Sequence, residues 1–231
     1  MQRPHTTVIL ATSADGKIAD VDRRAARFGS LQDKAHLERQ IAQVDAVLFG
    51  AGTLRAYGTS LPITSPELLQ QRQDKPPQPI HIVASASGAI DPQLRFFQQL
   101  VPRWLLTTQT GDQGWQGSTQ FDRVLAAGTE TLDWSIALTH LCNAGIKKLA
   151  VLGGGTLVAS LLEVGAIDEL WITICPLLLG GATAPTLVEG SGFPQTIAPR
   201  LQLLEVKTIN QEVFLHYRVV PQDPETRDSD E

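Results

Sequence analysis

The hydrophobic residues of the chain occur in short runs that end at glycine, proline or polar turns. Runs rich in β-branched residues predict buried strands, and apolar residues spaced three and four positions apart predict helices. One helix is expected from Ser30 to about Gln43, with Ser30 and Asp33 forming a capping box. A second helix follows Asp133 and ends at Gly145. Buried strands are expected at 6–13, 45–49, 80–84, 104–107, 121–125, 148–152 and 170–175, and a third helix at 156–164.

The end of the chain follows a different pattern, because apolar and polar residues alternate from Val213 to Val219. Together with the apolar residues of 201–206 and a turn at Asn210, this predicts an antiparallel hairpin. The earlier segments alternate between strands and helices, which is typical of parallel sheets. We therefore predict an α/β fold, with a mixed, mostly parallel sheet flanked by helices and a C-terminal antiparallel hairpin. Surface connections are expected at 61–79, with a short helix at 66–72, and at 111–120.

Length and charge bear on the domain organisation and on the class of partner. The 231 residues suit one domain, which we place at 1–220. The segment 221–231 holds five acidic residues and one arginine, so it is predicted to be a disordered acidic tail. Without this tail the net charge of −5 falls close to zero. A near-neutral body does not attract a nucleic-acid backbone, so no nucleic-acid partner is expected.

The apolar segments and cysteines indicate the compartment. Cys142 and Cys175 both lie in apolar stretches, so we expect core residues and no disulfide. No apolar run is long enough to cross a bilayer, and the chain does not open with a leader-like pattern. These features predict a soluble, cytoplasmic protein with no membrane partner.

Two glycine-rich turns carry the strongest chemical signal. The runs 47–53 (VLFGAGT) and 150–157 (AVLGGGTL) each join an apolar strand to glycines. Glycine lets a ligand approach the backbone, and the start of the following helix favours an anion such as phosphate. The alternative is that the glycines only form tight turns. Neither run has the spacing of a dinucleotide fingerprint or a P-loop.

A third cluster, Ser13-Ala14-Asp15-Gly16-Lys17-Ile18, follows the first strand. It places polar side chains at the carboxyl end of a strand, where open α/β sheets hold their ligands. The alternative is an exposed turn with a solvated lysine. The run His36-Leu37-Glu38 has the first half of a zinc deaminase motif, but no Pro-Cys-x-x-Cys follows, so no metal site is expected.

Together and in this order, these motifs resemble the reductase domain of riboflavin biosynthesis, which has the dihydrofolate-reductase-like fold. The resemblance extends from about Arg3 to Tyr217. It is carried by Arg3-Pro4, Ser13-Ala14-Asp15-Gly16-Lys17-Ile18-Ala19, the runs 45–53 and 152–157, Ile167-Asp168-Glu169-Leu170, Pro176 and Leu179-Gly180-Gly181. The deaminase domain that often precedes this domain is not found before the first strand, so we expect a separate deaminase.

The resemblance implies that NADPH reduces a ribosylaminopyrimidine 5′-phosphate. Hydride goes to C1′ of the sugar in its ring-opened imine form and gives a ribitylamine. In the uracil-type branch, 5-amino-6-(5-phosphoribosylamino)uracil becomes 5-amino-6-(5-phosphoribitylamino)uracil. The protein would place the nicotinamide against C1′ and exclude water. Relatives are usually dimers, so a homodimer is expected, with the C-terminal hairpin as a plausible contact.

The same resemblance assigns roles to residues of this chain. Asp15 is the first candidate for the proton donor, and Lys17 is the competing electrostatic partner. The residues implied to bind the cofactor are Gly50, Gly52, Thr53, Tyr57, Gly153, Gly154, Gly155, Thr156 and Leu157. Those implied to lie near the substrate are Ser13, Asp15 and Arg55. Arg55 and Arg103 are candidates for a 2′-phosphate, with plain surface charges as the alternative.

The chain departs from the family pattern at three places. Family members often have an acidic residue at the position of Tyr57, and a glutamate at that of Leu152. They often have Asp-Pro and then Leu-Thr where this chain has 58–62 (GTSLP). Two further hypotheses therefore stay open. One is an NADPH reductase of the same fold that acts on a pterin or another imine, and the other is a nucleotide-binding module without catalysis.

Overall fold

The computed structural model describes residues 2–72 and 75–220, so the predicted acidic tail lies outside the described residues. Its strands are β1 His5–Ser13, β2 Ala46–Gly50, β3 Ile80–Ala84, β4 Arg103–Thr107, β5 Arg123–Ala126, β6 Lys148–Val151, β7 Glu169–Cys175, β8 Arg200–Ile209 and β9 Glu212–Val220. Its helices are α1 Leu31–Gln43, α2 Ala51–Tyr57, α3 Pro66–Gln71, α4 Gln109–Asp112, α5 Trp134–Asn143 and α6 Gly155–Glu163, with short 3-10 helices η1 Arg95–Gln98, η2 Gln113–Trp115 and η3 Gln195–Ile197. These elements confirm the predicted strands, the main helices and the final hairpin to within a few residues.

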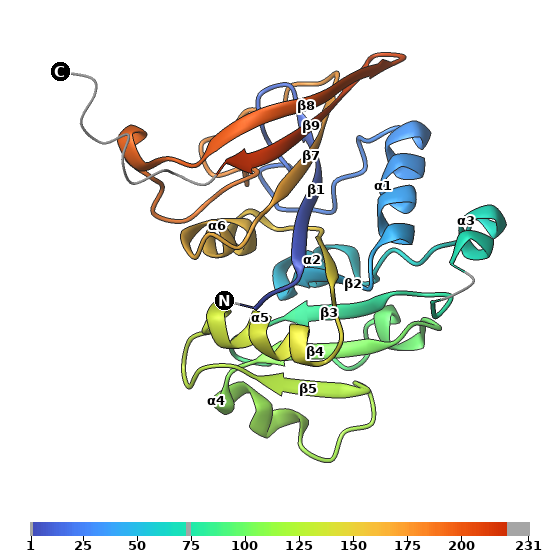
Figure 1. Ribbon diagram of the computed structural model, residues 1–231, viewed down its shortest axis with the longest axis vertical. Coiled ribbons are helices and arrows are strands. Elements are labelled where there is room, and N and C mark those ends of the chain that lie inside the picture. Colours follow the sequence, from blue (N-terminus) through green and yellow to red (C-terminus); the bar gives the residue numbers. More distant parts are fainter. Residues whose placement is uncertain (1, 73–74, 221–231) are drawn as a thin grey trace.

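The described strands form one nine-stranded sheet in the order β5-β4-β3-β2-β6-β1-β7-β9-β8 (Figure 1). Strands β1 to β7 are all parallel to one another, and β9 is antiparallel to both of its neighbours, β7 and β8. This confirms the predicted mixed, mostly parallel α/β architecture. Strand β6 lies between β1 and β2, so the carboxyl ends of these three strands meet at one edge of the sheet. That edge is where a ligand site is expected in an open α/β sheet.

Helices cover both faces of the sheet. Side chains of α1 and α2, such as Ile41 and Leu54, are buried in one core cluster with Ile9 and Phe49. Side chains of α5 and α6 are buried in the cluster on the other face, around Val8. In Figure 1, the β8–β9 hairpin extends beyond both helical layers. Every residue of β8 except the last is exposed, so this strand adds little to either core.

The loop prediction for 111–120 is wrong in its first half. Helix α4 begins after Thr108, whose hydroxyl accepts a hydrogen bond from Gly111 N at 3.1 Å. The η2 helix then turns Trp115 inward, where its indole Nε1 donates to the carbonyl of Gly88 at 2.7 Å. Trp115 packs against Phe121 with ring centroids 4.8 Å apart. An aromatic side chain among glycines and glutamines therefore anchors this loop in the core.

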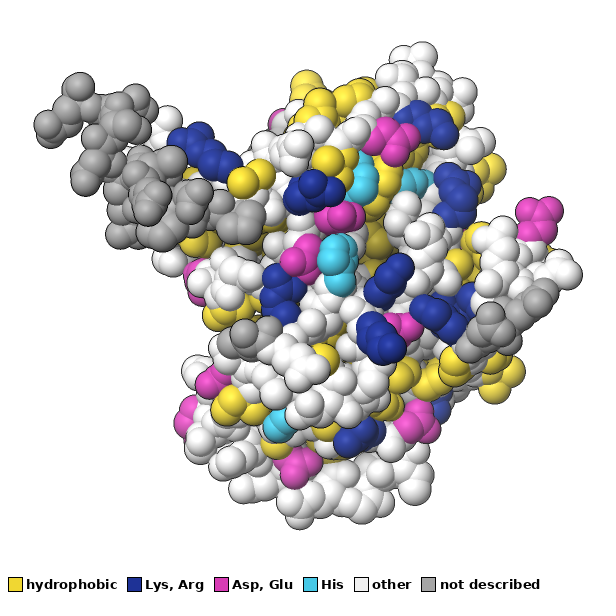
Figure 2. All heavy atoms as spheres, in the orientation of Figure 1, with side chains coloured by type: hydrophobic (Ala, Val, Ile, Leu, Met, Phe, Trp, Pro, Cys, Tyr) yellow, Lys and Arg dark blue, Asp and Glu magenta, His cyan; other side chains and the backbone are white. Residues whose placement is uncertain are grey.

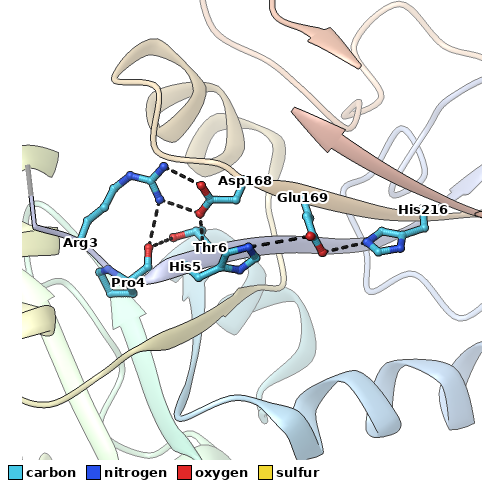
Figure 3. A network of polar contacts seen from close by, with 7 residues as sticks. All are labelled: Arg3, Pro4, His5, Thr6, Asp168, Glu169 and His216. Atoms are coloured by element: carbon cyan, nitrogen blue, oxygen red, sulfur yellow. Dashed lines mark hydrogen bonds and ion pairs between the residues drawn. The ribbon is translucent and has the colours of Figure 1, made fainter. Parts of the chain in front are cut away.

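Two motifs that lie far apart in sequence meet at the opposite edge of the sheet, near the amino ends of β1 and β7. Arg3 Nη1 and Nη2 each donate to the carboxylate of Asp168 at 2.7 Å (Figure 3). Thr6 N also donates to Asp168 Oδ2 at 2.7 Å. This bidentate pair ties the start of the chain to β7. The neighbouring Glu169 lies between His5 and His216, with carboxylate–imidazole distances of 3.8 and 2.9 Å.

Replacing Arg3 by alanine should lower the free energy of unfolding by about 1 kcal/mol, because the pair is bidentate but partly exposed. Urea unfolding followed by fluorescence measures this change. Arg24 is the matched control, since its ion pair with Asp20 is largely exposed. Equal stability of Arg3→Ala and Arg24→Ala would contradict the role of the pair.

Candidate active site

The two glycine turns are joined to each other at the carboxyl edge of the sheet. Gly50 N, at the end of β2, donates to the carbonyl of Gly153 at 2.9 Å. Leu152 N donates to the carbonyl of Leu48 at 2.8 Å. Helix α2 starts directly after Gly50, and α6 starts at Gly155. The two strand–glycine–helix units that the sequence presents separately thus form one continuous surface.

Some of these glycines are required by the fold itself. Gly153 has φ +97°, a conformation that other residues rarely adopt. A Cβ on Gly155 would lie 2.2 Å from the carbonyl oxygen of Thr186. These two glycines therefore say little about a ligand.

The other three glycines are not explained by the fold. A Cβ on Gly50 would meet only backbone atoms of the next turn at 3.9 Å, which is an ordinary contact. A Cβ on Gly154 would meet only Thr53 Oγ1, at 3.6 Å, and one on Gly52 would meet nothing within 4 Å. None of the three has a positive φ. Their missing side chains leave open a cradle between α2 and α6 that fits the close approach of a ligand.

The first turn of α6 offers backbone donors beside this cradle. Among the described residues, no acceptor binds the backbone N–H of Gly155, Thr156 or Leu157, as expected for a first helical turn. The Thr156 hydroxyl already has a partner, since it donates to Glu189 Oε2 at 2.8 Å. The other carboxylate oxygen of Glu189, Oε1, lies 3.6 Å from Arg23 Nη2. Glu189 is a site residue that the sequence reasoning missed, because it lies in an irregular loop.

The remaining residues of the predicted cofactor set have mixed surroundings. The side chain of Leu157 is buried in the core, so only its backbone faces the turn. Tyr57 Oη donates to the carbonyl of Ala26 at 2.9 Å and holds the loop before α1 against α2.

Arg55 is exposed on α2, and its side chain forms no ion pair within 2–72 and 75–220. Arg103 begins β4 at the opposite edge and binds the carbonyls of Gln99 and Gln120, so the suggestion that it meets a 2′-phosphate is wrong.

The third cluster places Asp15 in a structural role. Ser13 Oγ donates to Asp15 Oδ1 at 2.6 Å, and the backbone N–H groups of Leu179 and Gly180 donate to the carboxylate at 3.1 and 2.6 Å. These hydrogen bonds, led by that of Ser13, lower the pKa of Asp15 to about 2. A carboxyl group with this pKa holds no proton near neutral pH. The environment therefore argues against Asp15 as the proton donor and makes it a clamp between two loops.

Lys17 lies in the same loop with fewer partners. Its backbone N–H donates to Ser13 Oγ at 2.9 Å, which fixes the loop. Its ammonium Nζ donates to the carbonyl of Ala184 at 3.3 Å. Further ammonium hydrogens remain for a ligand, because a lysine has three donors. Of the two candidate catalytic side chains, Lys17 has the surroundings that suit contact with an anionic or carbonyl-bearing substrate.

Charged and metal-ligating side chains bear on other kinds of site. On the face shown in Figure 2, basic and acidic side chains are interspersed. No cluster of three or more histidine, cysteine or acidic side chains suitable for a metal occurs in the described part of the chain. None of the described helices is long and apolar enough to span a bilayer.

Comparisons with known proteins agree with this architecture. The chain is 30% identical over 194 residues to the 2,5-diamino-6-ribosylamino-4(3H)-pyrimidinone 5′-phosphate reductase of Archaeoglobus fulgidus, covering 83% of this chain and 89% of that protein. A reductase of the same name from Methanothermobacter thermautotrophicus is 28% identical over 221 residues, and the match spans 94% of this chain and 99% of that protein. The crystal structure of a pyrimidine reductase-like protein from Corynebacterium diphtheriae has the same fold, with a TM-score of 0.81 at 24% identity over 95% of this chain and 93% of that one.

A family model covers almost the entire described chain. The model of the RibD C-terminal domain matches residues 4–215, from Pro4, just before β1, to the middle of β9. The matched range contains both glycine turns and the loop of Asp15 and Lys17. The chain therefore belongs to the RibD C-terminal domain family.

Proposed function

We propose that this protein is an NADPH-dependent reductase of a ribosylaminopyrimidine 5′-phosphate in riboflavin biosynthesis. The observation that carries the proposal is the cradle formed by Gly50, Gly52 and Gly154, three glycines that the fold does not require. A dinucleotide such as NADPH, bound at the carboxyl ends of the strands, must bring its phosphates close to the protein backbone, and glycines permit this approach. The archaeal relatives named above, which this chain matches over most of their length, are reductases of such a substrate.

In the proposed complex, the cradle and the first turn of α6 hold the cofactor. Thr53, half-buried beside Gly154, contributes a hydroxyl, and the free N–H groups of α6 face the phosphates. The cofactor supplies the hydride when bound. Ser13 and Asp15 keep the loop of Lys17 in place, so that its ammonium contacts the substrate near the reacting sugar carbon. Water supplies the proton in this scheme, because Asp15 is held as a carboxylate.

The direct test is NADPH oxidation, followed at 340 nm, with two substrates. One is 5-amino-6-(5-phosphoribosylamino)uracil, the substrate of the uracil-type branch. The other is the 2,5-diamino-6-ribosylamino-4(3H)-pyrimidinone 5′-phosphate after which the archaeal relatives are named. Turnover of either supports the proposal. Binding of NADPH without turnover of either would favour another imine or a non-catalytic module, and absence of NADPH binding would overturn the proposal altogether.

We also propose that the protein works in the cytoplasm as a homodimer formed through β8. This strand lies at the edge of the sheet and exposes a row of apolar side chains. Leu201 is 45% exposed, Leu203 is 50% exposed and Val206 is 54% exposed. An uncovered apolar edge strand is a ready site for pairing with a second copy.

Replacing Val206 by aspartate should therefore convert the dimer to a monomer, because it puts a charge into the proposed contact. Light scattering coupled to gel filtration measures the mass. Val164→Asp is the control, since Val164 is also exposed, 43%, but follows α6. A monomeric wild-type protein at micromolar concentration would contradict the dimer.

A further inference from the structure

Glu189 brings a negative charge to the start of α6, the end of the helix that the proposed cofactor phosphates face. Its Oε2 accepts a hydrogen bond from the Thr156 hydroxyl at 2.8 Å. A Cβ built on Gly155 would lie 2.8 Å from Glu189 Cγ, so the side chain packs directly against the first residue of the helix. The N-cap residue Gly154 supplies no side-chain hydrogen bond of its own. A carboxylate from a distant loop therefore occupies the helix end that favours an anion.

The backbone of Glu189 is fixed in this position. Its N–H donates to the carbonyl of Gly155 at 3.2 Å. Earlier in the same loop, the carbonyl oxygen of Thr186 lies so close to Gly155 that a Cβ there would be 2.2 Å away. Thr186 also forms an antiparallel bridge with Lys17. With its backbone held on two sides, the carboxylate leaves the helix only by rotation of its own side chain.

Arg23 offers the carboxylate a second position. Its Nη2 lies 3.6 Å from Glu189 Oε1 and donates to the carbonyl of Thr183 at 3.4 Å. A close charge-assisted hydrogen bond is about 2.7–2.9 Å long, so this ion pair has room to tighten. The side chain of Arg23 is 62% exposed, and little packing restricts its movement. Glu189 thus lies between two partners, the hydroxyl of Thr156 on the helix and the guanidinium of Arg23 outside it.

We propose that Glu189 is an internal competitor of the cofactor: its carboxylate holds Thr156 in the free protein and turns to Arg23 when the phosphates of NADPH bind. This inference rests on the proposed function and adds the residue that sets the affinity for the cofactor. The Thr156 hydroxyl has one hydrogen to donate, so carboxylate and phosphate exclude each other there. Two anions at one helix terminus also repel each other. Part of the binding energy of the cofactor is therefore spent on displacing Glu189.

The variant Glu189→Gln separates the charge from the contact, because the amide oxygen still accepts a hydrogen bond from Thr156. It should bind NADPH about fivefold more tightly than the wild type at low salt. The difference should shrink as salt is added, because salt screens the repulsion between the two anions. Glu163→Gln removes the same charge from the other end of α6 and should leave the affinity unchanged. Fluorescence titration with NADPH measures all three proteins.

Arg23→Ala tests the second position of the carboxylate. In the wild-type background it should weaken NADPH binding, because the displaced carboxylate loses its partner. In the Glu189→Gln background it should have no effect, since no carboxylate remains to be displaced. An arginine that binds the phosphates directly would weaken binding equally in both backgrounds. Equal effects would therefore overturn the proposed turn of Glu189 toward Arg23.

The outcomes separate this inference from the proposed reaction. Unchanged or weaker NADPH binding by Glu189→Gln would overturn the role of Glu189 as a competitor, even if the wild-type protein reduces its substrate. Tighter binding without turnover of either substrate would support that role and overturn the reaction.

If the wild-type protein does not bind NADPH, the proposed function is overturned and inorganic pyrophosphate becomes the probe, followed by calorimetric titration. Tighter binding of pyrophosphate by Glu189→Gln than by the wild type would support the competitor at the start of α6. Equal binding, or no binding by either protein, would overturn it.

Discussion

Alanine at Gly52 or at Gly154 should raise the dissociation constant of NADPH about tenfold or more, because a methyl group would occupy space that the cofactor needs. Stability should not fall. Gly52 is a helical position in open space, where alanine is favoured by up to about 1 kcal/mol. The φ of −84° and ψ of −176° at Gly154 lie in the extended region that alanine also occupies. A loss of affinity in these variants therefore reports a ligand and not a damaged fold.

Two further glycines complete this experiment. Gly114 lies in η2, far from the two glycine turns, and a Cβ there would meet nothing within 4 Å. Gly114→Ala should therefore change neither the affinity for NADPH nor the stability. Gly155→Ala should lower stability, because its Cβ meets the Thr186 carbonyl at 2.2 Å. NADPH affinity is measured by fluorescence titration and stability by thermal unfolding. Full affinity in both Gly52→Ala and Gly154→Ala would place the cofactor elsewhere.

Acid should destabilise the protein through His81, and His81→Leu should remove part of that sensitivity. His81 is fully buried on β3, and neither ring nitrogen has a hydrogen-bond partner among the residues that the structure describes. Burial, aided by the charge of Arg103, lowers its pKa to about 4 from 6.5. The unfolded chain therefore binds a proton more readily than the folded one. The stability contributed by neutral His81 is complete above about pH 6.5 and is lost as the pH falls toward 4.

From pH 7 to pH 5 this loss amounts to about 2 kcal/mol for one such histidine. Urea unfolding at both pH values should show that the decrease is smaller by this amount in His81→Leu than in the wild type. Burial also lowers the pKa of His36 to about 4, so His36 should account for a further part of the stability lost in acid. His140→Leu is the control, because that histidine is half-buried at the end of α5. The same pH dependence in His81→Leu and wild type would show that His81 is not the group responsible.

The architecture was predictable from the sequence, because its strands are apolar and its helices begin at side-chain caps. Ser30 and Asp133 cap α1 and α5 as expected, and Asn210 forms the hairpin turn. The inward turn of Trp115 was not predictable, since nothing in a loop of glycines and glutamines shows which side chain meets the core. The insertion of β6 between β1 and β2 also depends on contacts between distant segments.

The candidate site was predictable in outline and less so in its roles. The glycine turns and the loop of Lys17 do meet at one edge, as strand ends of a parallel sheet must. The hydrogen bond from Ser13 to Asp15 is local, but the role of Asp15 as a clamp depends on Leu179 and Gly180, which are over a hundred and sixty residues away. Asp33 was assigned to a capping box because the spacing fits. The structure gives that task to Glu212, the first residue of β9, which accepts a hydrogen bond from Ser30 N.

The position of β6 has a consequence for synthesis on the ribosome. Among the described strands, β1 pairs with β6 and β7, so it leaves the exit tunnel long before its partners, the first of which begins at Lys148. Until then β1 and β2 are nascent apolar segments with unpaired edges, which favour association with other chains. A ribosome stalled before Lys148 should therefore display a chaperone-dependent chain, and the active site should assemble only when the last third of the protein has been made.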